Sequence, residues 1–103
     1  MGIPITEVAE VIRSKNSGPY ELTMDIIFKD FDSYEKVKQK NIINKKLIST
    51  LYQIPEEDII SIINFDPAKA IKITIKRPLV AGAVGESDVY GAQQHAPLLG
   101  IEV

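Results

Sequence analysis

Polar residues near the amino terminus combine two cations with hydroxyl and amide groups. Arg13, Lys15, Asn16 and Ser17 follow one another closely and run into Gly18-Pro19. Guanidinium and ammonium groups beside flexible backbone donors suit the binding of a carboxylate or a phosphate. The spacing is not that of a phosphate loop, which needs Gly-x-x-x-x-Gly-Lys leading into a helix. The alternative is a polar helix end, in which both cations offset the helix dipole.

The single histidine, His95, follows Gln94 near the carboxyl end. Imidazole exchanges protons readily near neutral pH, so His95 could act as a general acid or base while Gln94 orients a substrate. One histidine without a recognisable nucleophile or a fixed carboxylate is an incomplete catalytic set, and hydrogen bonding within a docked tail is the alternative. The chain has no cysteine and no metal-ligand spacing, so we expect neither a metal nor a cofactor.

The carboxyl-terminal segment is unusual because no charged residue lies between Asp88 and Glu102. Terminal segments are normally polar and poorly ordered. This one carries aromatic and apolar residues that need a surface to cover, either on their own domain or on another protein. We therefore expect a domain at 1–80, followed at 81–103 by a linker and a partner-docking tail. The residues expected to bind the partner are Tyr90, Pro97, Leu98 and Leu99.

Charge and hydropathy exclude two classes of partner. The chain has 103 residues and a net charge of −2, without a basic face that would bind nucleic acid. The amino terminus lacks a basic start followed by an apolar run, and no apolar stretch is long enough to cross a bilayer. We expect a cytoplasmic protein with neither nucleic acid nor a membrane as its partner.

The spacing of apolar residues predicts the first two elements. A helix over 6–14 is predicted by residues that recur with a helical period, namely Ile5, Val8, Ala9 and Ile12. From Tyr20 the period changes to two, and a half-buried strand is predicted by Leu22, Met24, Ile26 and Phe28. Asp25 lies on the other face of that strand, where it either pairs with Arg13 or Lys15 or is simply exposed.

Two short helices and a β-hairpin are predicted after this strand. Asp30 and Asn44 are each placed to cap the amino end of a helix. Two β-rich runs, 59–65 and 70–76, flank Asp66-Pro67, which is typical of a turn. The resulting order predicts an α+β fold with a small, mostly antiparallel sheet, helices on one face and an extended tail. A fourth strand would come from the tail or from another chain, and an open edge is expected beside 71–75.

Three stretches of sequence, 11–23, 64–72 and 88–98, together resemble a bacterial family of small stand-alone domains of unassigned function. The resemblance covers essentially the whole chain. Members of that family are typically encoded beside large proteins of the acyclic terpene utilisation type, in clusters that catabolise short organic acids and amino acids. More remotely, 11–34 is similar to a small carboxy-terminal domain fused to some of those proteins, which implies a ferredoxin-like fold.

The resemblance implies a small subunit that pairs with the large protein in a hetero-oligomer and completes its active site. The reaction implied is a hydro-lyase step on a short, branched di- or hydroxycarboxylic acid. In that scheme Arg13 and Lys15, with Asn16 and Ser17, would hold a carboxylate, and His95 would exchange a proton or position water. A non-catalytic assembly or stability partner is the alternative. A self-sufficient small enzyme is a third possibility, which the incomplete catalytic set disfavours.

Overall fold

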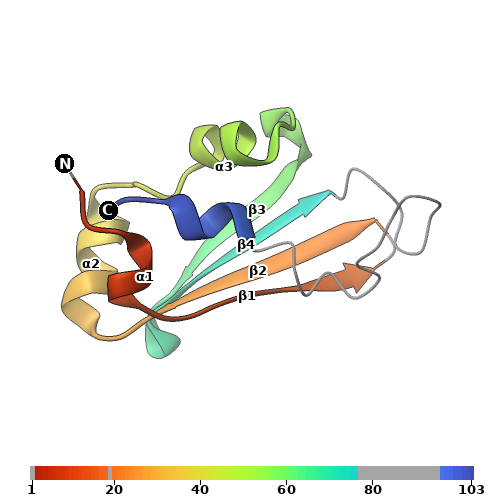
Figure 1. Cartoon of the computed structure of the whole chain (residues 1–103). Coiled ribbons are helices and arrows are strands. Elements are labelled where there is room, and N and C mark those ends of the chain that lie inside the picture. The colour runs from red at the N-terminus through yellow and green to blue at the C-terminus, as the bar shows by residue number, and fades with distance from the viewer. Residues whose placement is uncertain (1, 19, 77–95) are drawn as a thin grey trace.

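The computed structural model describes residues 2–18, 20–76 and 96–103 (Figure 1). Within them, four antiparallel strands form one open sheet in the order β1-β2-β4-β3. The strands are β1 (Ala9–Gly18), β2 (Glu21–Phe28), β3 (Ile59–Phe65) and β4 (Ala70–Lys76). The predicted α+β class and antiparallel sheet are confirmed.

The connection between β2 and β3 is a split β-α-β unit, the unit from which ferredoxin-like folds are built. β4 lies between β2 and β3 and is antiparallel to both, so β2 and β3 run in the same direction. β1 completes the sheet on the other side of β2. The fourth strand of the described sheet is therefore β1, from the amino-terminal part of the chain, where the sequence predicted a helix. β4 is an interior strand, so the edges of the sheet formed by the described residues are β1 and β3 instead of the expected edge beside 71–75.

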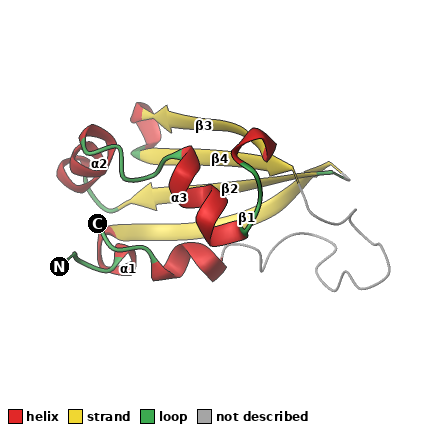
Figure 2. Ribbon diagram, turned by 90° about the horizontal axis from the view of Figure 1, so that it is seen from above, coloured by secondary structure: helices red, strands yellow, loops and turns green. Residues whose placement is uncertain are grey.

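Two helices, α2 (Phe31–Gln39) and α3 (Lys45–Tyr52), connect β2 to β3 and cover one face of the sheet (Figure 2). Both begin at the predicted caps: Asp30 accepts a hydrogen bond from the Ser33 backbone at 2.8 Å, and Asn44 accepts one from Leu47 at 2.8 Å. The predicted hairpin is also confirmed, with β3 and β4 joined through the short 3₁₀ helix η2 (Asp66–Ala68). Another 3₁₀ helix, η1 (Glu56–Asp58), leads into β3.

The largest departure from the sequence-based prediction is at 9–18, where a strand replaces most of the helix predicted over 6–14. The helix α1 spans only Ile5–Val8. Along β1, alternate side chains lie on opposite faces of the sheet, with Ser14 opposite Met24 and Arg13 opposite Asp25. β-branched residues favour a strand, and pairing with β2 satisfies the backbone of β1. These gains outweigh the helical spacing of a few apolar residues.

The hydrophobic core lies between the sheet and the helices, and the chain's last residues are part of it. Leu98 is fully buried and Ile101 nearly so, in the same cluster as the core residues of β2, α2 and α3. Ile5 N–H donates to the carbonyl of Ile101 at 2.8 Å, which joins the two ends of the chain. Leu98 belongs to the 3₁₀ helix η3 (Ala96–Gly100), which lies on the same side of the sheet as α3 (Figures 1 and 2).

Residues Leu98 and Ile101 of the predicted tail at 81–103 thus pack on their own domain. Residues 77–95 of that segment lie outside the described residues.

Candidate functional site

The face of the sheet that α2, α3 and η3 leave open carries the predicted cations. Arg13 and Lys15 lie on this face of β1, opposite Asp25 and Thr23 of β2. Lys72 of β4 is the other neighbour of Asp25 across the sheet. Two cationic side chains on neighbouring strands therefore flank one carboxylate, and Lys15 lies beside them.

Asp25 is the centre of this open-face cluster. The Arg13 Nε donates to Asp25 Oδ2 at 3.3 Å, and the residue Asp25 is only 8% exposed. Its other carboxylate oxygen, Oδ1, is buried and has no hydrogen-bond partner in the described part of the chain. A buried, unsatisfied carboxylate oxygen is costly, so Asp25 is poised to accept a further donor.

Arg13 is both anchored and accessible. Its side chain is 65% exposed, and its bond to Asp25 uses Nε. The two terminal amino groups of the guanidinium therefore remain for a ligand, in the planar geometry that matches a carboxylate. Of the two possibilities for Asp25, pairing with Arg13 is the one that the structure confirms.

The structure separates the four residues predicted to hold a substrate. Arg13 and Lys15 share the open face, whereas Asn16 lies opposite Leu22 of β2 and so on the helix-covered face. Ser17 is exposed near the end of β1. Lys72 is the member of the cluster that the sequence reasoning missed. The strand alternation that sets Lys72 against Ile71 and Ile73 was the available signal, but its place beside Asp25 depends on the register of β2 and β4.

The residues predicted for catalysis and partner binding fall mostly outside this cluster. His95, Gln94 and Tyr90 lie outside the described residues, and so does the side chain of Pro97. Leu98 is inside its own domain and presents no surface to a partner. Leu99 is 43% exposed and remains available for contact.

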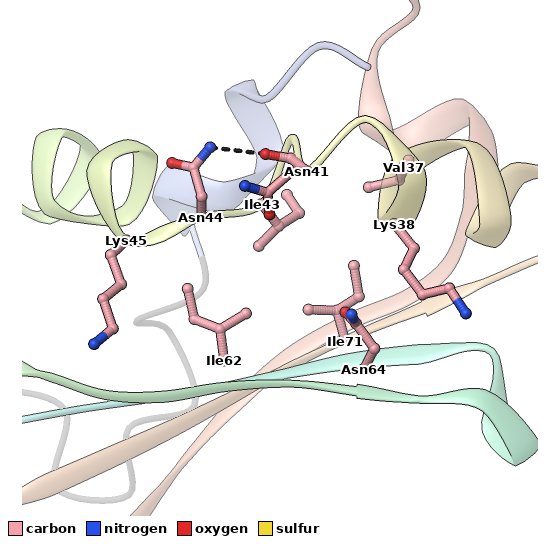
Figure 3. A pocket seen from close by; sticks show the side chains of 9 residues that line it. All are labelled: Val37, Lys38, Asn41, Ile43, Asn44, Lys45, Ile62, Asn64 and Ile71. Carbon is pink, nitrogen blue, oxygen red and sulfur yellow. Dashed lines mark hydrogen bonds between the residues drawn. The ribbon is translucent and has the colours of Figure 1, made fainter.

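A cavity of about 330 Å³ lies on the helical side of the sheet, between the α2–α3 connection and β3 (Figure 3). Its polar lining consists of Lys38, Asn41, Asn44, Lys45 and Asn64, and its apolar lining of Val37, Ile43, Ile62 and Ile71. Asn44 is committed to structure, because its Nδ2 donates to the carbonyl of Asn41 at 2.7 Å while its Oδ1 caps α3.

Lys38 at the rim of this cavity is also committed. Its Nζ lies 3.1 Å from Glu35 and 3.2 Å from Asp66, and these hydrogen bonds raise its pKa. The hydroxyl of Tyr34 donates to the same Asp66, and hydrogen bonds from Tyr34 and Lys38 lower the pKa of that carboxyl. Burial is the main cause that raises the pKa of Tyr34 to about 12. This network fastens α2 to the turn after β3 and leaves Lys45 as the cavity's unpaired cation among the described residues.

Comparison with known proteins identifies the class of domain. The family model for a domain of unknown function, DUF4387, matches residues 5–102. The chain therefore belongs to the DUF4387 family, as a small α+β domain with an open four-stranded sheet. No curated protein and no solved structure matches the chain significantly. In the part of the chain that the structure describes, no helix is both long and apolar enough to span a membrane.

Proposed function

We propose that the chain is the small subunit of a two-component catabolic enzyme of the cytoplasm, paired with a large protein of the acyclic terpene utilisation type. The observation that carries the proposal is the open-face cluster, in which Arg13 and Lys72 flank the buried carboxylate of Asp25. These groups suit a ligand with a carboxylate, but they stand on a sheet face that α2, α3 and η3 leave uncovered. Ion pairs in contact with water contribute little to the free energy of binding, so a working site here needs a second protein that excludes water from it.

The substrate proposed is a short, branched di- or hydroxycarboxylic acid, and the reaction is a hydro-lyase step. The terminal amino groups of Arg13 would bind a substrate carboxylate in a bidentate manner, with Lys15 or Lys72 as a second cation. Asp25 would orient the guanidinium of Arg13 through the hydrogen bond that its Oδ2 atom accepts from Nε. His95, assisted by Gln94, stays the proposed proton carrier.

A non-catalytic assembly or stability partner of the same large protein is the second candidate. The observation that favours it is that the Arg13–Asp25 pair joins two neighbouring strands, a structural role that needs no ligand. The two candidates differ in what the cluster does once the complex has formed.

The test is co-expression with a large protein of the acyclic terpene utilisation type, followed by size-exclusion chromatography with mass determination and an assay for hydration of short branched carboxylic acids. Co-elution is expected. Arg13→Ala should then leave the complex intact but lower kcat/KM by roughly a hundredfold, the scale on which lost positioning groups act. Lys46→Ala, at an exposed lysine of α3, is the matched control and should leave turnover unchanged.

Unchanged turnover in Arg13→Ala would favour the assembly partner. A wild-type chain that elutes alone would overturn both candidates.

A further inference from the structure

β3 is an edge strand that lacks the usual protection. Among the described residues it pairs only with β4, and it contains no charged residue and no proline. Ile60, Ile63 and Phe65 on it are each about half exposed, at 51%, 51% and 53%. Natural proteins normally guard an exposed edge with charges, proline or a covering element, because unpaired backbone groups recruit further strands. An unguarded apolar edge is the feature that strand-addition sites present.

The two sides of β3 differ in chemistry. Ile62 and Asn64 face the helical side, where they line the cavity of about 330 Å³ together with Lys45 (Figure 3). Ile63 and Phe65 lie opposite Lys72 and Ala70 of β4, on the open face. Successive side chains of a strand point to opposite faces of the sheet. A strand added beside β3 would therefore place alternate side chains in two different environments.

The cavity side favours acidic side chains. Lys45 extends from the start of α3 toward β3, and no described residue pairs with it (Figure 3). The amides of Asn41 and Asn64 add hydrogen-bonding groups to the same lining. The open-face side, by contrast, offers the apolar surfaces of Ile63 and Phe65.

We infer that β3 binds, by strand addition, an extended segment of the large protein in which acidic and apolar side chains alternate. The acidic set enters the cavity beside Lys45, and the apolar set covers Ile63 and Phe65. A second copy of this chain fits less well, because its own β3 carries no carboxylate to match Lys45. The identity of the partner rests on the function proposed above, whereas the chemistry of the segment rests on the edge and the cavity.

Two pairs of substitutions test the inference in the co-expressed complex. Ile63→Lys places a charge among the apolar contacts, and Lys45→Glu reverses the charge at the cavity. Their matched controls are Val11→Lys, on the opposite edge strand, and Lys46→Glu, the next residue of α3. Each of the first two should weaken binding of the large protein by about tenfold or more, and each control by less than about twofold. Circular dichroism confirms that the variants are folded.

The outcomes separate this inference from the proposed function. If the wild-type complex forms and both Ile63→Lys and Lys45→Glu bind as tightly, the inference is overturned and the proposed function stands. If the wild-type chain binds no large protein, the proposed function fails.

If the wild-type chain binds no large protein, strand addition at β3 is tested by nuclear magnetic resonance titration of the full chain with the peptide acetyl-Glu-Val-Glu-Val-Glu-Val-Glu-amide. Shifts confined to β3 and the cavity, and lost in Ile63→Lys, support it. Absence of such shifts, or a dimer of the chain itself that Ile63→Lys dissolves, overturns it.

Discussion

β1 and β3 form the two edges of one sheet, yet they are built from different kinds of residue. β1 carries Glu10, Arg13 and Lys15, and its register with β2 is interrupted at both ends. β3 carries no charge along its length and exposes Ile60, Ile63 and Phe65. The pairing of β3 with β4 also has a register shift, between Ile59 and Ser61, so the two edges differ in charge and not in regularity. Charged side chains discourage the pairing of further strands, and an uncharged apolar edge invites it.

We propose that the charges of β1 protect its edge against further strands, whereas the β3 edge suits a partner strand. Beside the β1 edge, the two terminal parts of the chain are joined, since α1 leads into β1 and is hydrogen-bonded to Ile101 near the carboxyl end. At the β3 end, a cavity with polar and apolar lining lies beside the bare strand. A substitution that destabilises the fold should therefore act mainly at the first end, and one that affects binding at the second.

The largest expected effect on folding stability comes from the buried residues near the carboxyl end. Leu98→Ala removes a fully buried side chain from the core and should lower the free energy of unfolding by about 2–5 kcal/mol. Leu99→Ala, at the exposed neighbouring residue, should change it by less than about 0.5 kcal/mol. Urea unfolding followed by circular dichroism measures both. Equal effects of the two substitutions would show that the carboxyl-terminal residues are not part of the fold.

The next effect concerns the pair that fastens β1 to β2. Arg13→Ala leaves the carboxylate of Asp25 buried without its partner and should cost about 2 kcal/mol of folding stability. Lys15→Ala, on the same face of the same strand, is the control and should cost less than about 0.5 kcal/mol. A double-mutant cycle with Asp25→Asn should return a coupling energy of about 1 kcal/mol. A coupling near zero would mean that the pair does not hold the strand.

A smaller effect is expected where α2 meets the turn after β3. Tyr34→Phe removes the hydrogen bond to Asp66 and should lower stability by roughly 1 kcal/mol at neutral pH. Because the pKa of Asp66 is lowered in the fold, its contribution is present above 3.8 and is lost as the pH falls through the lower folded pKa. Because the pKa of Tyr34 is raised from 10.0 to about 12, its contribution is present below pH 10 and is lost as the pH rises toward 12.

The difference in unfolding free energy between wild type and Tyr34→Phe should therefore shrink in both acid and alkali. Urea unfolding at a series of pH values measures it. A difference that stays constant from pH 3 to pH 11 would contradict the assignment.

The smallest expected effects on stability come from two substitutions that compare the β3 edge with the β1 edge. Ile63→Lys and Val11→Lys replace side chains that are partly exposed, so each should change the free energy of unfolding by less than about 0.5 kcal/mol. Only Ile63→Lys should slow the aggregation of the isolated chain, because a charge protects the bare edge. Light scattering at raised protein concentration measures the rates. Equal slowing by both substitutions would contradict the proposed difference between the edges.

Local features of the sequence predicted much of the fold correctly. The caps at Asp30 and Asn44 fix the starts of two helices through contacts within a few residues, so they can be read without knowledge of the tertiary structure. The alternation in β2 and β4 and the turn at Asp66 are equally local. β1 could not be predicted in this way, because polar residues such as Ser14 lie on its core face and its stability depends on pairing with β2.

The candidate site could be predicted only in part for the same reason. Arg13 and Lys15 can be identified by residue type. Asn16 lies on the other face of the sheet because side chains alternate along a strand, and the sequence predicted no strand here. The approach of Lys72 to Asp25 depends on strand register. The exposed edge at β3 depends on strand order, because the sequence shows that 59–65 is a strand but not which of its sides is unpaired.

The most direct test of the partner edge proposed at β3 is hydrogen–deuterium exchange, read at single residues, in the isolated chain and in the proposed complex with a large protein of the acyclic terpene utilisation type. β3 residues Ile59–Phe65 should contain amides that exchange rapidly in the isolated chain and become protected in the complex, while amides of β1 residues Ala9–Gly18 keep their rates. Protection that appears at β1 and leaves β3 unchanged would contradict the account.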